Sequence, residues 1–484
     1  MNKKHHLVVF SGGSAANNLV DVFGKVADDK GCSLSYIIPI SDNGGSSSEL
    51  IRVFGGPGIG DVRSRLVRLI PEDPSSPETT TIKTLFNHRL HASPTEARNE
   101  WLDIVESRHP LWQSITSEKR ELIRSFLNTI NLEIVKRARP SSVFNFQSAS
   151  VGNLFLTGAR LFTGSFESAI YLLGAITGVP SNVNVIPAIN SNFSHHISAG
   201  LQDGTIITGQ NAISHPSAPS SSSVIPSSSS PSSHPSTESS PETQQQRRKL
   251  SKELTDHDLV DDANLPGSLP TLRKQYITFQ KTHTEDLASR IERIWYINPY
   301  GQEIRPSANP KVLETLRGAG CVVYSIGSLY TSILPCLVLK GVGEAMAREE
   351  GIKYKVLILN GSLDRETRAA GQDGESNEFG AKDFIAAIAK ACHGSRGLGE
   401  VKEEEWKQYV THVIHLQGEG TPRVEKEELS ALGIETVRIY GRKHEGGEGG
   451  MVYDGTALGQ ALEAIMGRRD PRSDKTRRNT LNVS

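Results

Sequence analysis

The chain has 484 residues, enough for two or three average domains. Its 53 basic and 54 acidic residues nearly cancel, and no basic face interleaved with aromatic residues is evident, so we expect no nucleic-acid partner. No apolar run approaches the roughly 20 residues that span a bilayer, so we expect no membrane contact. The four cysteines are scattered without paired spacing and no signal peptide is recognisable, which predicts a cytoplasmic protein in a reducing compartment.

Two segments are too polar to belong to a folded core. Residues 214–285 begin with a Ser/Pro-rich stretch and predict a disordered linker, and residues 468–484 predict a flexible basic tail. Residues 1–213 and 286–467 are then expected to form one discontinuous domain, because strands from both sides are needed to complete one sheet. Residues 71–145 are polar with an amphipathic pattern, which predicts a helical insertion.

Short apolar, β-branched runs alternate with helical patterns along the chain. The predicted strands are Leu7–Phe10, Leu34–Ile40, Asn184–Pro187, Ile291–Ile297, Cys321–Ser325, Val356–Leu359, Val413–Leu416 and Thr436–Tyr440. The predicted helices include Ala15–Val26, Pro310–Arg317, Val342–Glu349, Lys382–Ala391 and Ala457–Met466. Apolar runs of this length are typical of strands that are buried on both faces of a parallel sheet. The alternation therefore predicts an α/β fold with a doubly wound, mostly parallel sheet.

The first predicted strand ends in a loop rich in glycine and polar side chains. Gly12 and Gly13 would allow a phosphate to approach closely, and Ser14 and Asn17 add hydrogen-bond donors. In a parallel sheet this loop lies at the carboxyl edge, where anions bind. The loop does not match GxGxxG, however, and a tight turn that needs positive φ would also explain its glycines.

The second predicted strand ends at Asp42, the position where a doubly wound site commonly meets a ribose or a polar ring. Behind it, Gly44, Gly45 and Ser46 belong to a glycine- and serine-rich run that could cradle an anionic group. The alternative is an aspartate that caps a helix, or a plain Asn-Gly turn.

Glycine and proline are dense again between residues 55 and 60, more so than a simple connection needs. We expect Asp61 to cap the helix that follows. Arg63 could reach a phosphate, although arginines on a helix face are more often solvated. A single Mg²⁺ held through Asp42 or Asp61 would fit the few protein ligands that this ion takes.

The strand that ends at Ser325 leads into a further loop of the same kind. Gly327 permits a turn, and Ser328, Thr331 and Ser332 could donate to phosphate oxygens. A hydrolase nucleophile would require GxSxG, which is absent, so we do not interpret Ser328 as a nucleophile. Several such loops at the ends of parallel strands meet at one edge of the sheet, which predicts a single anion-binding site.

At these loops the sequence resembles the 2-phospho-L-lactate transferase (CofD-like) family, and most of all its gluconeogenesis-factor (YvcK-like) branch. The stretches that carry the resemblance are Val8–Gly13, Ser41–Ser47, Gly58–Arg63, Gly152–Leu154 and Gly327–Ser332. The resemblance implies a Rossmann-like fold and a nucleotide-linked small-molecule ligand.

In the transferase branch, a phospholactyl-type group passes from a guanosine diphosphate donor to an alcohol acceptor with the help of Mg²⁺, and guanosine monophosphate is released. Carried over to this chain, the resemblance implies that Asp42 lies near the acceptor hydroxyl and that Asp61 is the second acidic position. It further implies that the nucleotide is bordered by Gly12, Gly13, Asn153, Ser328, Thr331 and Ser332.

The other branch implies a different function, that of a non-catalytic regulator of carbon metabolism that binds a sugar nucleotide or a dinucleotide. The run Asn43–Ser46 is closer to this branch than to the transferases, whose alcohol acceptor is a deazaflavin. We favour the transferase slightly, because it is the named activity of the family. The sequence leaves open the acceptor, the base of the nucleotide and the oligomeric state, a homo-oligomer included.

Overall fold

The computed structural model describes residues 6–12, 15–72, 75–139, 142–215, 269, 272, 286–348, 351–368, 379–443 and 450–467. Gly13 and Ser14, nearly all of the predicted linker and the whole predicted tail lie outside these residues. No helix in the described part of the chain combines the length and the apolar character needed to span a bilayer.

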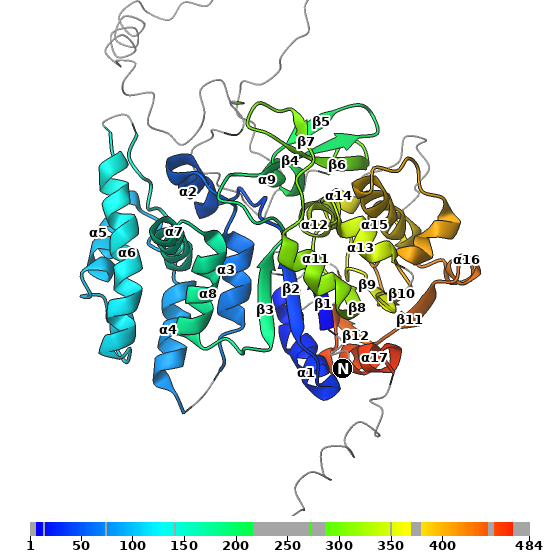
Figure 1. Ribbon diagram of the computed structural model, residues 1–484, viewed down its shortest axis with the longest axis horizontal. Helices are drawn as coiled ribbons and strands as arrows, with labels where there is room; N and C mark the ends of the chain where they lie inside the picture. The colour runs from blue at the N-terminus through cyan, green and yellow to red at the C-terminus, as the bar shows by residue number, and fades with distance from the viewer. Residues whose placement is uncertain are drawn as a thin grey trace, which may run out of the picture.

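A sheet of seven strands, parallel at every pairing, forms the centre of the protein (Figure 1). Its order is β11-β10-β9-β8-β1-β2-β3. The strands are β1 (His6–Phe10), β2 (Leu34–Ile38), β3 (Val183–Pro187), β8 (Ala319–Tyr324), β9 (Tyr354–Ile358), β10 (His412–His415) and β11 (Glu435–Arg438). The predicted α/β class and the doubly wound parallel sheet are confirmed.

Helices cover this sheet, which explains why its central strands are continuous apolar runs. Every residue of β2 is buried, as are Leu7 to Phe10 of β1. One pair of packed helices consists of α1 (Val20–Lys30) and α17 (Gly455–Ile465). A separate row is formed by α11 (Pro310–Arg317), α13 (Val342–Ala347) and α15 (Ala381–Ser395).

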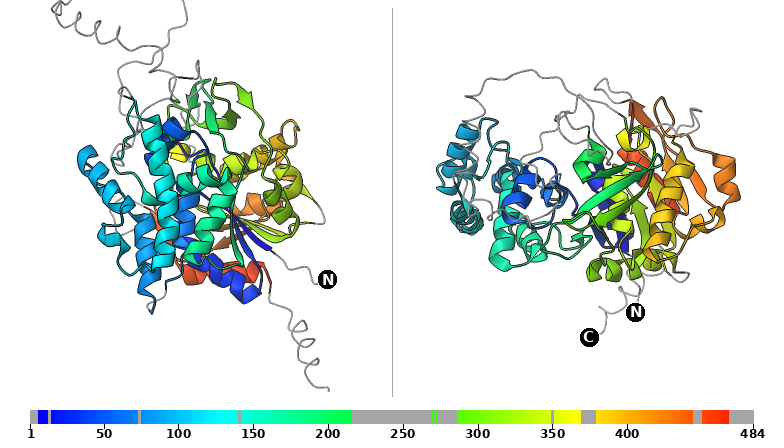
Figure 2. Two further views of the ribbon diagram at one scale, coloured as in Figure 1. Left: turned by 60° about the vertical axis from the view of Figure 1, so that its left-hand side comes forward. Right: turned by 90° about the horizontal axis from the view of Figure 1, so that it is seen from above.

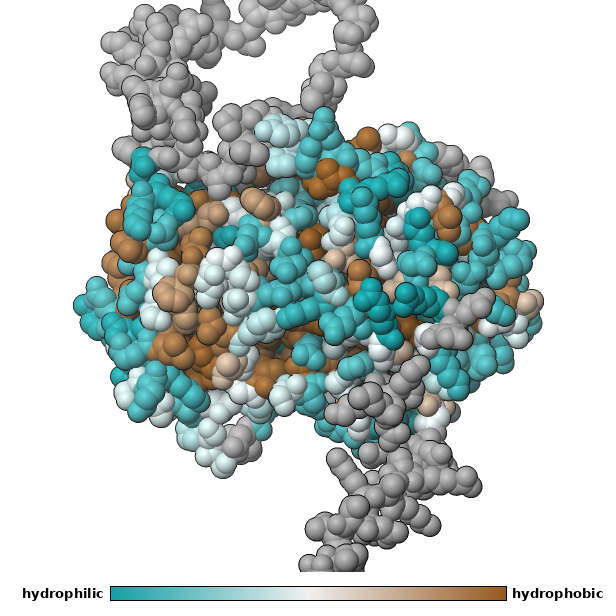
Figure 3. Space-filling model, in the orientation of Figure 1, coloured by the Kyte–Doolittle hydropathy of each residue, from teal (hydrophilic) through white to brown (hydrophobic). Residues whose placement is uncertain are grey.

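A group of helices lies beyond β3, on the left of Figure 1 and of the right-hand view in Figure 2. Its members are α2 (Ser46–Phe54), α3 (Gly60–Arg68), α4 (Pro77–Asn87), α5 (Pro94–Val105), α6 (Ser117–Arg137), α7 (Val151–Thr163) and α8 (Phe166–Thr177). Helix α7 packs against five of the others, and its Phe155 meets Phe86 and Phe126 edge to face at ring-centroid distances of 5.0 and 5.4 Å. Apolar side chains also reach the surface over this group (Figure 3).

A second, antiparallel sheet of order β5-β4-β6-β7 lies at the top of Figure 1. Its strands are β4 (His196–Leu201), β5 (Ile206–Thr208), β6 (Ile291–Ile297) and β7 (Glu303–Ile304). The assignment of Ile291–Ile297 to the parallel sheet was therefore wrong. Its Glu292 and Arg293 are exposed while Ile294 is buried, and such a strand does not suit a sheet covered on both faces.

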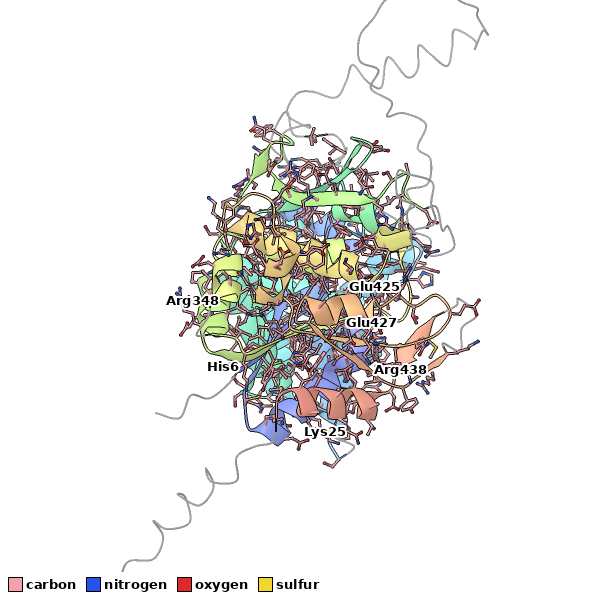
Figure 4. All side chains as sticks on the ribbon, turned by 90° about the vertical axis from the view of Figure 1, so that its right-hand side faces the viewer. His6, Lys25, Arg348, Glu425, Glu427 and Arg438 are labelled. Carbon is pink, nitrogen blue, oxygen red and sulfur yellow. The ribbon has the colours of Figure 1, made fainter. Side chains whose placement is uncertain are left out.

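Figure 4 labels residues at the amino-terminal and the carboxyl-terminal ends of strands in the central sheet. His6 is the first residue of β1 and Arg438 is the last residue of β11, and they lie on opposite sides of this view. Beyond β11 the chain forms an antiparallel pair, β12 (Gly441–Lys443) and β13 (Met451–Tyr453).

Candidate functional site

The order of the strands in the central sheet has a switch point between the neighbouring strands β1 and β8. From β1 the chain proceeds outward to β2 and β3, and it later returns to place β8 to β11 on the other side. In open parallel sheets, ligands bind at such a switch point, outside the carboxyl ends of the strands. Gly12 follows β1 and Gly327 follows β8, so two of the predicted loops border the switch point. A Cβ atom on Gly327 would lie 3.8 Å from the carbonyl oxygen of Gly12.

Three separate segments meet at Gly12. A Cβ atom on this residue would lie 2.9 Å from Cβ of Ser332 and 3.1 Å from Oδ2 of Asp61. Ser332 belongs to η5 (Leu329–Ile333), a short π-helical segment after β8, and Asp61 belongs to the first turn of α3. The predicted convergence of these residues at one place is therefore seen in the structure. Asp61 does not cap α3, however, because the helix begins at Gly60 after a non-capping Ile59.

The Asp42 carboxylate is held at the start of α3 by its own loop. Oδ1 accepts a hydrogen bond of 3.0 Å from the Gly44 amide, and Oδ2 accepts one of 3.0 Å from the Ser47 hydroxyl. A Cβ atom on Gly60 would lie 2.3 Å from Oδ2 of Asp42, so a side chain at this position would displace the Asp42 carboxylate. Because Gly60 and Asp61 are neighbours, the two acidic side chains flank the same helix terminus.

Opposing effects act on the pKa of Asp42. Burial raises the pKa of the Asp42 carboxyl, although the Gly44 amide, the Ser47 hydroxyl and the positive charge of Arg63 act in the opposite direction. Burial also lowers the pKa of Arg63 to about 10, and the charges of Asp61 and Asp42 oppose this shift. Arg63 thus stays positively charged at neutral pH within electrostatic reach of both carboxylates.

Asn153 connects the helical group to the loop after β2. Its side-chain nitrogen donates a hydrogen bond of 3.0 Å to Ser46 Oγ, and its side-chain oxygen accepts one of 3.3 Å from Arg63 Nε. Gly152 allows this approach, since a Cβ atom there would lie 2.8 Å from Cδ of Arg63. The predicted residues Ser46, Arg63 and Asn153 therefore form one connected polar group.

The loop after β8 is fixed from the loop after β9. The Gly327 amide donates to Asn360 Oδ1, and Asn360 Nδ2 donates to the Gly327 carbonyl oxygen, both at 2.9 Å. Gly327 has a φ of +133°, which the exchange of hydrogen bonds with Asn360 holds in place.

Beneath this loop lies a buried acidic side chain that sequence reasoning did not single out. Glu366, on α14 (Arg365–Arg368), accepts hydrogen bonds from the amides of Tyr330 and Thr331 at 2.8 and 3.2 Å. Burial, and then the charge of Asp364, raise the pKa of Glu366 to about 8. The Thr331 hydroxyl donates to Glu366, so it is not directed at the loop edge as the sequence suggested. A protonated Glu366 can instead donate a hydrogen bond to the Thr331 hydroxyl oxygen. The hydroxyl hydrogen of Thr331 is then available to another acceptor.

Other predicted residues have partners that are now visible. The side chain of Asn17 donates a hydrogen bond of 2.8 Å to Ser64. Ser328 precedes η5 and hydrogen-bonds the carboxyl of Asp364. Gly45 has a φ of +53° immediately before α2.

Arg65 is fully buried, donates to Ser11 Oγ at 3.2 Å and stacks over the ring of Tyr36 at 4.6 Å. This arginine therefore belongs to the structural core and is not available to a phosphate.

A short helix that the sequence did not indicate closes over the Asp42 loop. Helix α9 (Gln210–Ser214) follows β5 of the second sheet, and Gln210 accepts a hydrogen bond of 3.1 Å from Ser41. The Asn211 amide donates to Asn43 Oδ1, also at 3.1 Å. No local sequence signal marks these contacts, because they depend on how the second sheet is placed against the first.

A basic cavity of about 650 Å³ adjoins the same edge of the sheet. Its lining includes Asn18, Ile326 and Gly361 from the loops after β1, β8 and β9. Positive charge comes from Arg68, Arg442 and Lys443. Arginine and lysine side chains of this kind suit an anionic group.

The donors around Asp42 fit a hard cation such as Mg²⁺. The carboxylates of Asp42 and Asp61 would supply oxygen ligands, and each Asp42 oxygen accepts only one of the hydrogen bonds described above. Mg²⁺ is typically bound by one or two carboxylates together with water and substrate phosphates. Neither histidine nor cysteine would be needed.

Gly58 provides a direct test of how tightly the Asp42 loop is packed. A Cβ atom on Gly58 would lie 2.2 Å from the carbonyl oxygen of Asp42. We expect Gly58→Ala to lower the free energy of unfolding by about 2–3 kcal/mol, because the loop backbone must move. Urea unfolding measures this. Gly24→Ala in α1, where a Cβ atom meets nothing within 4 Å, should instead stabilise by about 0.5–1 kcal/mol. Equal effects of the two changes would contradict the close packing.

This architecture defines a doubly wound α/β protein whose polar loops meet at the switch point of its sheet. The chain belongs to the family of 2-phospho-L-lactate transferase CofD, whose family model matches residues 7–439. The family resemblance predicted from the loop motifs is thus confirmed.

Curated relatives cover nearly the whole chain. An uncharacterised protein of Saccharomyces cerevisiae is 39% identical over 415 residues, which is 85% of this chain and 90% of the yeast protein. Gluconeogenesis factors of Halalkalibacterium halodurans and Bacillus subtilis are 23% and 21% identical, and each alignment covers 90% of this chain and 90% and 91% of the two relatives. A crystal structure of a protein from Bacillus halodurans aligns over 95% of this chain and all of the other chain with a TM-score of 0.55 and 20% identity, which supports the shared fold.

Proposed function

We propose that this protein is a cytoplasmic, 2-phospho-L-lactate transferase-like enzyme. It would transfer a phosphoryl-containing group of the phospholactyl type from a guanosine diphosphate donor to an alcohol acceptor. The observation that carries the proposal is the position of the Asp42 carboxylate beside Gly60 and Asp61, with Arg63 within electrostatic reach. A proton acceptor and a positive charge are what a phosphoryl transfer to a hydroxyl needs.

The proposed reaction forms one P–O bond and breaks another. The acceptor hydroxyl oxygen attacks the phosphorus that carries the lactyl group, and the bond from that phosphorus to the guanosine monophosphate oxygen breaks. The hydroxyl proton passes to Asp42, and guanosine monophosphate leaves. The raised pKa of Asp42 supports this role, since a carboxylate of higher pKa is a stronger proton acceptor.

The other groups at the edge would bind and orient the donor. Arg63 would neutralise charge on the transferring phosphoryl oxygens, and Gly12 would let the nucleotide phosphates lie close to the backbone. Asp42 and Asp61 would hold a Mg²⁺ ion, which when bound supplies further charge neutralisation to the phosphates. The basic cavity that contains Arg442 and Lys443 would receive a second anionic part of the ligand.

The four cysteines support the proposed compartment. All of them are buried and free of disulfides: Cys32, Cys321, Cys336 and Cys392. Unpaired buried cysteines are usual in reducing compartments.

A thermal-shift panel tests the proposed donor. GDP and GTP, UDP-sugars and NAD are each added with and without Mg²⁺, at concentrations well above the expected dissociation constant. We expect guanine nucleotides with Mg²⁺ to raise the melting temperature by a few degrees, because a ligand that binds only the folded state stabilises it. If none of these compounds shifts the transition, the nucleotide-binding proposal is wrong.

The relatives named gluconeogenesis factors favour a second candidate function. In that case the protein binds a sugar nucleotide or a dinucleotide without turnover and regulates carbon metabolism. A shift with UDP-sugars or NAD alone, independent of Mg²⁺, would support this candidate over the transferase. Chromatographic detection of guanosine monophosphate release would decide for the enzyme.

A further inference from the structure

Three metal-ligand side chains meet in the helical group, on elements that contribute none of the loops at the edge of the sheet. His88 follows the last residue of α4, Glu100 lies on α5, and His109 precedes η2 (Pro110–Trp112). One ligand atom from each lies within 4.8 Å of the other two. No motif spacing marks this group in the sequence, because its members come from three separate elements.

The Nε2 atoms of both imidazole rings approach the same carboxylate oxygen. Nε2 of His88 lies 2.6 Å and Nε2 of His109 lies 3.6 Å from Oε1 of Glu100, and the ring centroids are 5.7 Å apart. Ligand atoms around a tetrahedral zinc ion, each about 2.0–2.1 Å from the metal, lie roughly 3.3 Å from one another. Rotations of the side chains that move these atoms by about 1 Å would bring them to that spacing.

The surrounding backbone positions two of the three groups. The second oxygen of Glu100 accepts a hydrogen bond of 2.8 Å from the His91 amide, and Nδ1 of His109 accepts one of 3.2 Å from the Leu111 amide. The His91 contact orients a carboxylate as outer-sphere hydrogen bonds do in metal sites. The Leu111 contact places the proton of a neutral His109 on Nε2, so binding an ion through Nε2 requires this proton to move to Nδ1 and the Leu111 hydrogen bond to break.

The chemistry of the ligands selects the class of ion. Two imidazoles and one carboxylate suit Zn²⁺ and related transition metals, whereas Mg²⁺ and Ca²⁺ prefer oxygen ligands. The three side chains are only 20–26% exposed, so an ion can enter but is partly shielded from water.

We propose that His88, Glu100 and His109 bind one divalent transition-metal ion of the zinc class, which ties the end of α4 to α5 and η2. Three protein ligands leave a fourth position to water. The site is independent of the proposed transferase reaction, because none of its residues belongs to the loops at the carboxyl edge.

Titration of the full-length, chelator-treated protein tests the site. We expect Zn²⁺ to bind at one ion per chain in isothermal titration calorimetry, and Co²⁺ to give the visible absorption of a four-coordinate site. The dissociation constant for Zn²⁺ should rise in Glu100→Gln and in His88→Ala by more than the 10- to 100-fold cost that loss of an outer-sphere partner typically causes.

His91→Ala is the matched control. It removes a nearby imidazole but keeps the backbone amide that holds Glu100, so it should bind Zn²⁺ as the unchanged protein does. Circular dichroism confirms that each variant is folded, and Zn²⁺ should raise the melting temperature of the unchanged protein and of His91→Ala only. Unchanged affinity in Glu100→Gln and His88→Ala, loss of binding in His91→Ala, or no binding by the unchanged protein would each overturn the proposal.

Discussion

Asp42→Asn is expected to reduce the transfer rate by about 10²–10⁴-fold, the usual contribution of a positioned proton acceptor. The asparagine keeps the size of the side chain and can still accept the hydrogen bond from the Gly44 amide. Nucleotide binding should therefore be retained while turnover is lost. Release of guanosine monophosphate measures the rate, and the thermal shift with guanine nucleotides measures binding.

Asp203→Asn is a suitable control, because Asp203 is exposed and accepts a hydrogen bond from the Thr205 amide that asparagine can also accept. Its turnover should equal that of the unchanged protein. Full turnover in Asp42→Asn would show that Asp42 is not the proton acceptor.

Asp42→Asn should not destabilise the protein at pH 8. Because the pKa of Asp42 is raised in the folded state, its contribution to stability is present below the ordinary carboxyl pKa and is lost as the pH rises through the folded value. Asparagine carries no charge at any of these pH values. The melting temperature of Asp42→Asn at pH 8 should therefore equal or exceed that of the unchanged protein.

Glu366→Ala is expected to have the largest effect on folding. It leaves the amides of Tyr330 and Thr331 without their buried acceptor and opens a space beneath the loop after β8. The free energy of unfolding should fall by roughly 3–5 kcal/mol, since each unsatisfied buried donor costs about 1–3 kcal/mol. Glu366→Gln keeps an acceptor for both amides and should cost much less. Urea unfolding at pH 6 compares the two variants.

The pH dependence distinguishes Glu366 from an ordinary surface carboxylate. Its pKa rises from 4.5 to about 8 on folding, so the stability it contributes is complete below pH 4.5 and is lost between pH 4.5 and 8. Melting temperatures measured across this range should fall for the unchanged protein, and the fall should be shallower for Glu366→Gln. If the melting temperatures of the two proteins fall equally with pH, the pH dependence of stability does not come from Glu366.

The parallel sheet was predictable because most of its strands are short apolar runs that glycine-containing loops follow, and this pattern is local. The placement of Ile291–Ile297 was not, because an apolar run does not reveal its partner. That partner, β4, begins at His196 and contains serine, alanine and glycine, which give little strand signal. A sheet whose strands pair across distant parts of the chain is decided by tertiary packing.

The same distinction holds at the site. Gly12, Asp42 and Asp61 could be singled out because each follows a strand or begins a helix in a recognisable loop. Glu366 could not, since it lies in the charged segment Arg365–Arg368 that would equally suit a solvated helix. Its burial follows from the position of η5, more than thirty residues away along the chain.

The strand order also bears on how the protein is made. When β1, β2 and β3 leave the ribosome, one side of β1 has no neighbour until β8 is synthesised much later. An uncovered apolar strand is a site of self-association, so a nascent chain of this design benefits from a chaperone during that interval. A fragment that ends before Ala319 would lack both the second half of the sheet and Ser332 opposite Gly12. Complementation of two separately expressed halves is then the expected way to recover its ligand binding.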